Sequence, residues 1–136
     1  MKKRLIQVPA RSTPKPLFWI ASSRDDIREL PSDVQRIFGF ALRMAQLGGR
    51  YPDAQPLKGF GGAGVLEVVA YDDGDTFRAV YTVRLAGRVY VLDVFQKKSK
   101  SGIATPKADI DRIKARLKRA EQMHKDWLEA TKDEKA

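Results

Sequence analysis

An α+β domain with a mainly antiparallel sheet is the fold class that this sequence predicts, and three observations predict it. Apolar residues recur at helical spacing before Gly48, strand-like runs follow from Val65, and a helical stripe returns after Pro106. The order is therefore two helices, three strands and one helix, without alternation of single strands and helices. Such runs indicate an antiparallel sheet that carries the helices on one face. We expect the other sheet face to be open.

The two N-terminal helices are predicted from start and stop signals and from one apolar stripe. The stretch SSRDDIREL opens with hydroxyl side chains and early acids, which favour a helix start, and Pro31 ends it. The next stretch, PSDVQRIFGFALRMAQLGG, ends at the glycine pair 48–49. Its apolar positions share one helical face: Val34, Ile37, Phe38, Ala41, Leu42 and Ala45. Together the two helices form an N-terminal helical hairpin.

Three β-branched and aromatic runs predict a meander of antiparallel strands. VLEVVAY and TFRAVYTVRLA flank DDGD, which is a hairpin signal, and the turn LAGR leads into RVYVLDVFQKK. The short apolar run LFWIA at 17–21 is a candidate edge strand, so we expect three or four strands. Residues 50–64 are rich in glycine and proline and are predicted to form a loop.

The chain has the length of one domain, at 136 residues. Residues 1–16 carry five Lys or Arg and no acid, and their three prolines favour a flexible basic arm. Residues 17–130 form the predicted domain, and residues 131–136 are expected to fray. The final helix begins near Pro106, and five of its apolar residues lie on one stripe: Ile110, Ile113, Leu117, Ala120 and Trp127.

The net charge of +9 and the placement of that charge favour a nucleic-acid partner. Residues 95–119 hold nine Lys or Arg against two Asp, whereas a surface that is only soluble needs no such cluster. There is no cysteine, and His124 is the single histidine, so we expect no disulfide, no metal site and no other cofactor. No window approaches the roughly 18 apolar residues of a membrane span, and we expect a cytoplasmic protein.

Period-two geometry places the candidate site residues on the strands. Arg78 is expected on the open face, near the start of its strand, and the end of the next strand brings Lys97 and Lys98 to the same end of the sheet. Lys58 joins them from the glycine-rich loop. In the third strand, alternate residues are expected to share a face: Val89, Val91, Asp93, Phe95 and Lys97.

A group of Arg and Lys without His, Cys or metal indicates phosphodiester chemistry. Guanidinium groups bind phosphate oxygens, lysines add positive charge, and RNA supplies its own nucleophile in the 2′-hydroxyl. Each residue also has a plainer interpretation, as an exposed solubilising arginine or as lysines that guard a strand edge. Asp93 either titrates and transfers a proton or pairs with a neighbouring lysine, and both interpretations stay open. His124 is expected to be a packing or surface residue.

Three segments, PLKGFGGAGVLE, DGDTFRAVYTV and FQKKSKSGIATPKADID, carry a resemblance that extends over residues 17–121. In them the chain resembles the phage-derived branch of the RelE/HigB-type toxins, within the RelE/ParE superfamily. The resemblance implies a RelE-like fold, a cognate antitoxin partner, and metal-independent cleavage of mRNA on the translating ribosome. By motif position it implies these catalytic residues: Lys58, Arg78, Lys97 and Lys98. Further basic residues are expected to bind RNA: Arg84, Lys100, Lys107, Lys114 and Lys118.

Two other functions remain open beside this ribosome-dependent endoribonuclease. One is a ParE-like protein that inhibits a topoisomerase without cutting RNA. The other is a phage remnant that binds nucleic acid but is inactive. Relatives in this branch often carry a histidine two residues before the strand-end Phe, and this chain has Asp93 there, which favours the inactive remnant. Fold alone does not separate these functions.

Overall fold

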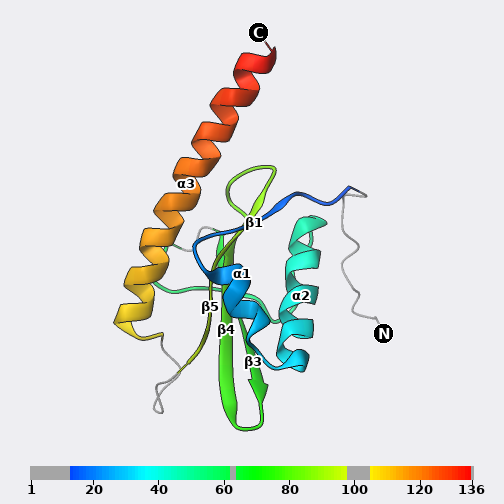
Figure 1. Cartoon of the computed structure of the whole chain (residues 1–136), viewed down its shortest axis with the longest axis vertical. Helices are drawn as coiled ribbons and strands as arrows, with labels where there is room; N and C mark the ends of the chain where they lie inside the picture. The colour runs from blue at the N-terminus through cyan, green and yellow to red at the C-terminus, as the bar shows by residue number, and fades with distance from the viewer. Residues whose placement is uncertain (1–12, 62–63, 98–104, 136) are drawn as a thin grey trace.

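The computed structural model describes residues 13–61, 64–97 and 105–135, and in these residues a five-stranded sheet lies between two helical layers (Figure 1). The elements in chain order are β1 (Leu17–Trp19), α1 (Ser23–Arg28), α2 (Ser32–Gln46), β2 (Gln55–Pro56), β3 (Val65–Asp72), β4 (Asp75–Thr82), β5 (Val89–Gln96) and α3 (Lys107–Lys135). The strand order is β1-β5-β4-β3-β2, in which β1 is parallel to β5 and the other neighbours are antiparallel.

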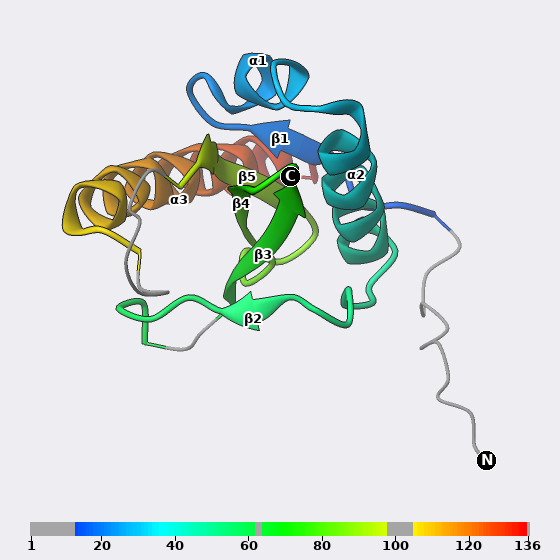
Figure 2. The ribbon, with the colours of Figure 1, turned by 90° about the horizontal axis from the view of Figure 1, so that it is seen from below.

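This architecture confirms the α+β class, the N-terminal helical hairpin, the meander of β3, β4 and β5, and the C-terminal helix. The sheet has more strands than the three or four expected, because β2 forms inside the segment expected to be a loop. Gln55 and Pro56 pair with Glu67 and Leu66, at the edge opposite β1 (Figure 2). Proline lacks the N–H that a central strand would need, so an edge strand tolerates it.

The β3–β4 hairpin forms where DDGD predicts it. Asp73 and Gly74 both have positive φ, at 50° and 86°, as a two-residue type I′ turn requires. Asp72 is therefore opposite Asp75, and this pairing sets the register of the whole hairpin. In that register Val69 lies opposite Arg78.

Both sheet faces are covered, so the expectation of an open second face is wrong. On one face Phe38 and Leu42 of α2 pack with Ala79 and Tyr81 of β4, within the larger core. On the other face α3 covers a second core, whose buried members are Ile20, Leu57, Val65, Val80, Tyr90, Leu92, Ile113, Leu117 and Ala120. The apolar stripe of α3 needs an apolar partner, and this sheet face supplies it.

A β-bulge in β5 breaks the alternation expected from the sequence. Val80 pairs with Asp93 while Tyr81 pairs with Val91, so Leu92 is the extra residue on β5. Val91 packs in the α2 core, whereas Leu92 and the next residue, Asp93, both face α3. The expectation that Val89, Val91, Asp93, Phe95 and Lys97 share one face is therefore wrong. An inserted residue reverses the facing of every residue after it.

The described residues include part of each predicted terminal segment. The predicted arm, residues 1–16, is described only from Thr13, and there Lys15 and Gln46 exchange two hydrogen bonds of 2.8 Å. The helix α3 continues to Lys135, through most of the segment expected to fray, and its C-terminal turns project beyond the sheet (Figure 1). Among the described helices, none combines the length and apolar character that a bilayer crossing needs.

Candidate active site

Arg78 lies at the centre of a buried polar group on the α3 side of the sheet. Its side chain is 5% exposed, whereas an open surface was expected, because α3 covers this face and Thr105, just before α3, contacts the guanidinium. The guanidinium forms an ion pair with Glu67 of β3. It also donates a hydrogen bond of 3.3 Å to Thr105 Oγ1, from the segment that leads into α3.

Glu67 is a site residue that the sequence reasoning missed. Its carboxylate accepts hydrogen bonds from Arg78 and from Thr105 Oγ1, the latter at 3.3 Å, and its side chain is 14% exposed. The signal was present in the sequence, since Glu67 is the single charged residue within VLEVVA. An acid inside a strand with two buried faces requires a cationic partner, and the hairpin register brings Glu67 diagonally across from Arg78.

A cavity of about 390 Å³ opens beside this polar group. Glu67 and Thr105 form part of its wall, and Lys58 joins them from the loop after β2. The remaining lining residues are Gln55, Pro56, Leu57, Gly59 and Ile110. The structure therefore places Lys58 and the Arg78 partners around one cavity, which we call the Lys58 cavity. Arg78 itself lies beneath Glu67 and outside the cavity lining.

Lys97 follows the last residue of β5, at the end of the sheet where β4 begins. Its backbone N–H continues the ladder with a hydrogen bond of 2.8 Å to Thr76 O, and Phe95 pairs with Arg78. Beyond the bulge, the period of two puts Lys97 on the Arg78 face, and the residue is 9% exposed. The other two predicted lysines of this region, Lys98 and Lys100, lie outside the described residues.

The remaining predicted RNA contacts lie on or beside α3 and are more exposed. Arg84 forms an ion pair with Glu121, and Lys107 pairs with Asp111 at 2.8 Å. Lys114 and Lys118 are both exposed, one turn apart on α3. We call these four residues the basic outer surface, in which Arg84 and Lys107 are each paired with an acid; it is separate from the buried group at Arg78.

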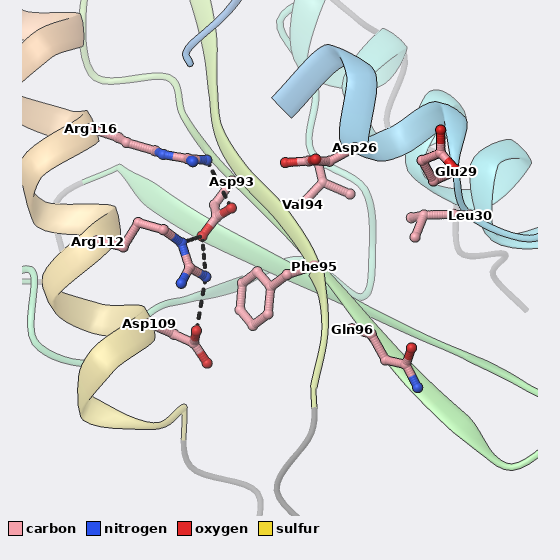
Figure 3. A pocket seen from close by; sticks show the side chains of 10 residues that line it. All are labelled: Asp26, Glu29, Leu30, Asp93, Val94, Phe95, Gln96, Asp109, Arg112 and Arg116. Carbon is pink, nitrogen blue, oxygen red and sulfur yellow. Dashed lines mark hydrogen bonds and ion pairs between the residues drawn. The ribbon is translucent and has the colours of Figure 1, made fainter. Parts of the chain in front are cut away.

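Asp93 faces two arginines of α3 and no described lysine (Figure 3). Arg112 binds Oδ2 with Nε at 2.8 Å and Nη2 at 2.7 Å, and Arg116 Nη1 binds Oδ1 at 2.9 Å. Arg112 also pairs with Asp109 at 2.8 Å. Burial raises the pKa of Asp93, while the hydrogen bonds and charges of the two arginines act in the opposite direction.

The Asp93 group borders a second cavity, of about 440 Å³, between α1 and α3. Asp26 of α1 and Glu29, the residue after α1, approach it opposite the arginines, as Figure 3 shows. Four carboxylates line this cavity, those of Asp26, Glu29, Asp93 and Asp109, against the two arginines, so its lining is net acidic. Such a lining disfavours a phosphate. The lining of the Lys58 cavity holds one lysine and one carboxylate, Lys58 and Glu67, with the Arg78 guanidinium bound to that carboxylate.

His124 is a buried packing residue, as expected, and lies far from both cavities along α3. Its Nδ1 is 3.0 Å from Tyr90 Oη, and its ring contacts that of Trp127, with centroids 5.3 Å apart. Arg88 completes the cluster, with its guanidinium 4.0 Å from the Trp127 ring centroid. Burial, with a smaller effect from Arg88, lowers the pKa of His124.

Residues 25–118 match the family described as phage-derived protein Gp49-like (DUF891). The chain belongs to this family. The match confirms the phage-derived branch that the sequence predicted, and its span contains every residue that lines the two cavities. No curated protein sequence matches this Gp49-like chain.

Two solved structures are similar to the Gp49-like chain at low sequence identity. One is a mutant of the Escherichia coli toxin RelE in the free state, with 18% identity, 65% of this chain and 88% of that chain covered, and a TM-score of 0.49. The other is the toxin–antitoxin complex RelBE2 from Mycobacterium tuberculosis, with 19% identity, coverage of 65% and 98%, and a TM-score of 0.40. Both likenesses are distant, and family membership rests on the sequence match alone.

Proposed function

We propose that this Gp49-like chain is the toxin of a type II toxin–antitoxin pair and that it cleaves mRNA on the translating ribosome. The observation that carries the proposal is the Arg78–Glu67–Thr105 group beside a cavity that also has Lys58 in its wall. This arrangement brings together a proton acceptor, the Glu67 carboxylate, and the positive charges of Arg78 and Lys58. The family match and the sequence resemblance support the same function.

The proposed reaction is attack of a 2′-hydroxyl on the neighbouring phosphorus. The O2′–P bond forms, the P–O5′ bond breaks, and the products end in a 2′,3′-cyclic phosphate and a 5′-hydroxyl. Glu67 takes the proton of the 2′-hydroxyl, and the leaving O5′ takes a proton from water. Lys58 and Lys97 stabilise the negative charge that develops on the phosphoryl oxygens. Lys98 belongs to the same proposed set.

Arg78 contributes from beneath the cavity in this proposal. Its guanidinium orients the Glu67 carboxylate through their ion pair and places a fixed positive charge close to the reacting phosphate. Such a charge acts strongly in a site of low dielectric because water does not screen it. Asp93 takes no part in proton transfer in this proposal, because it is 2% exposed and does not line the Lys58 cavity.

Substrate binding is assigned to the exposed basic surface. Lys114 and Lys118, with Arg84 and Lys107, neutralise RNA phosphates by counterion release, consistent with the net charge of +9. Lys100, outside the described residues, belongs to the same proposed set. The proposed partners are the ribosome with its mRNA and a cognate antitoxin. An antitoxin segment with acidic side chains complements this surface.

Primer extension on cellular mRNA after induction of the protein tests the proposal. We expect cuts within translated codons, and their loss when translation initiation is blocked. The double variant Arg78→Met/Glu67→Gln serves as the control, because it removes both charges of the buried pair together. Intact mRNA accompanied by a DNA-damage response indicates a topoisomerase inhibitor, and intact mRNA without growth arrest indicates an inactive remnant.

A further inference from the structure

The β-bulge of β5 and the Asp93 side chain belong to one structural unit. The extra residue, Leu92, accepts a hydrogen bond of 3.0 Å on its carbonyl oxygen from Arg116 Nη1 of α3. The same nitrogen binds Asp93 Oδ1 at 2.9 Å. A single guanidinium therefore holds both the backbone of the bulge and the side chain that follows it. We call Asp93, Arg112 and Arg116 the bulge network.

The bulge network decides which side chains reach the proposed site. Without the inserted residue, strict alternation would carry Lys97 to the α2 face of the sheet, away from Arg78. With it, Phe95 lies opposite Arg78, and Lys97 follows on the same face. The position of a proposed catalytic lysine thus depends on a backbone irregularity four to five residues earlier in the strand.

The network also fixes the start of α3. Arg112 and Arg116 lie in the second and third turns of the helix, and together they bring three N–H groups to the Asp93 carboxylate. The Pro106 carbonyl oxygen accepts hydrogen bonds of 3.0 Å from the first turn of α3, so Thr105 is attached to the helix through its next residue. Thr105 in turn accepts a hydrogen bond from Arg78 and donates one to Glu67, both at 3.3 Å.

We propose that Asp93 is a positioning residue: through Arg112 and Arg116 it holds the β5 bulge and the start of α3, and so places Lys97 and Thr105 at the Arg78–Glu67 pair. The proposal rests on the function proposed above for that pair. Asp93 is 2% exposed and does not line the Lys58 cavity, so it acts through its neighbours and not on RNA.

Amide hydrogen exchange tests the proposal without reference to activity. Asp93→Asn removes the charge that binds both arginines, and we expect the Lys97 amide, which donates to Thr76 O, to exchange roughly tenfold faster or more. Amides of the β3–β4 hairpin, such as that of Val68, keep their wild-type rates. Asp109→Asn is the matched control, because Asp109 binds the same Arg112 from within α3, whereas Asp93 binds it from β5. Unchanged Lys97 exchange in Asp93→Asn overturns the proposal.

Cleavage kinetics separate this proposal from the proposed function. In Asp93→Asn we expect the single-turnover rate on ribosome-bound mRNA to fall about 10–100-fold, as misplaced catalytic groups do, with the shape of the pH–rate profile retained. Arg116→Lys keeps a positive charge near Asp93 but loses the guanidinium geometry that binds both Asp93 and the Leu92 carbonyl oxygen. Its single-turnover rate should lie between those of the wild type and Asp93→Asn. If the pH–rate profile of Asp93→Asn lacks one of the two pH-dependent limbs of the wild-type profile, Asp93 transfers a proton directly, and a positioning role is refuted. If the wild-type protein cuts no mRNA, the proposed function fails, while the exchange result still decides the role of Asp93.

Discussion

Removing one member of the buried Arg78–Glu67 pair should destabilise the fold far more than removing both. In Arg78→Met the Glu67 carboxylate keeps Thr105 as its remaining described partner, in a side chain that is only 14% exposed. Breaking a buried pair on one side costs about 3–5 kcal/mol. We expect about 3 kcal/mol, since the cavity gives Glu67 some access to water. With an unfolding entropy of roughly 2.1 cal/mol/K per residue, this lowers Tm by about 10 °C.

Urea unfolding at pH 7 of the wild type, Arg78→Met, Glu67→Gln and the double variant measures this coupling. The double variant replaces the pair with side chains of similar size and no charge, and should unfold within about 1 kcal/mol of the wild type. The coupling energy from this cycle is then at least about 1.5 kcal/mol. A strictly additive cycle, or a loss below about 0.5 kcal/mol for Arg78→Met, refutes a buried pair and with it the geometry of the site.

Two further predictions concern pH and salt. Because burial lowers the pKa of His124, the unfolded chain takes up a proton below its ordinary pKa of 6.5 while the folded chain resists it, so stability falls from pH 7 to pH 5. The Tm of His124→Gln should fall less than that of the wild type between pH 7 and pH 5. If both proteins lose the same Tm, His124 takes up its proton as readily in the folded protein as in the unfolded chain. Ribosome affinity should fall steeply as the salt concentration rises. The double variant Lys114→Glu/Lys118→Glu should neutralise about two fewer phosphates, which makes the salt dependence shallower, and should leave the cleavage rate of bound RNA unchanged. A salt dependence that these changes leave unaltered removes α3 from the RNA-binding surface.

Much of the fold follows from local signals in the sequence. DDGD specifies a two-residue turn, and once Asp72 lies opposite Asp75 the position of Glu67 relative to Arg78 follows by counting. The Arg78–Glu67 pair was therefore within reach of the sequence. The covered second face was also indicated, because VYVLDVF is apolar at both alternating sets of positions, which is typical of a strand buried on two sides.

The bulge, by contrast, leaves no trace in the sequence. When both faces of a strand are apolar, the hydrophobic pattern does not show which residues point to which face. An extra residue at Leu92 therefore cannot be recognised from the sequence. The facing of Asp93 and Lys97 depends on that insertion and on the arginines of α3, about 20 residues away in the chain. Only tertiary packing determines it, which is why the sequence wrongly grouped Asp93 with Val89 and Val91, which face α2.

The single-turnover rate of mRNA cleavage in purified, programmed ribosomes tests the central claim most directly. The claim is that the Arg78–Glu67 pair and the cavity beside it form the active site. The wild-type protein should cut mRNA within the translated codon and leave a 2′,3′-cyclic phosphate. The Arg78→Met/Glu67→Gln variant, which should remain folded, is expected to cut at least about 100-fold more slowly. Intact mRNA with the wild-type protein, or an equal rate for the double variant, would contradict the account.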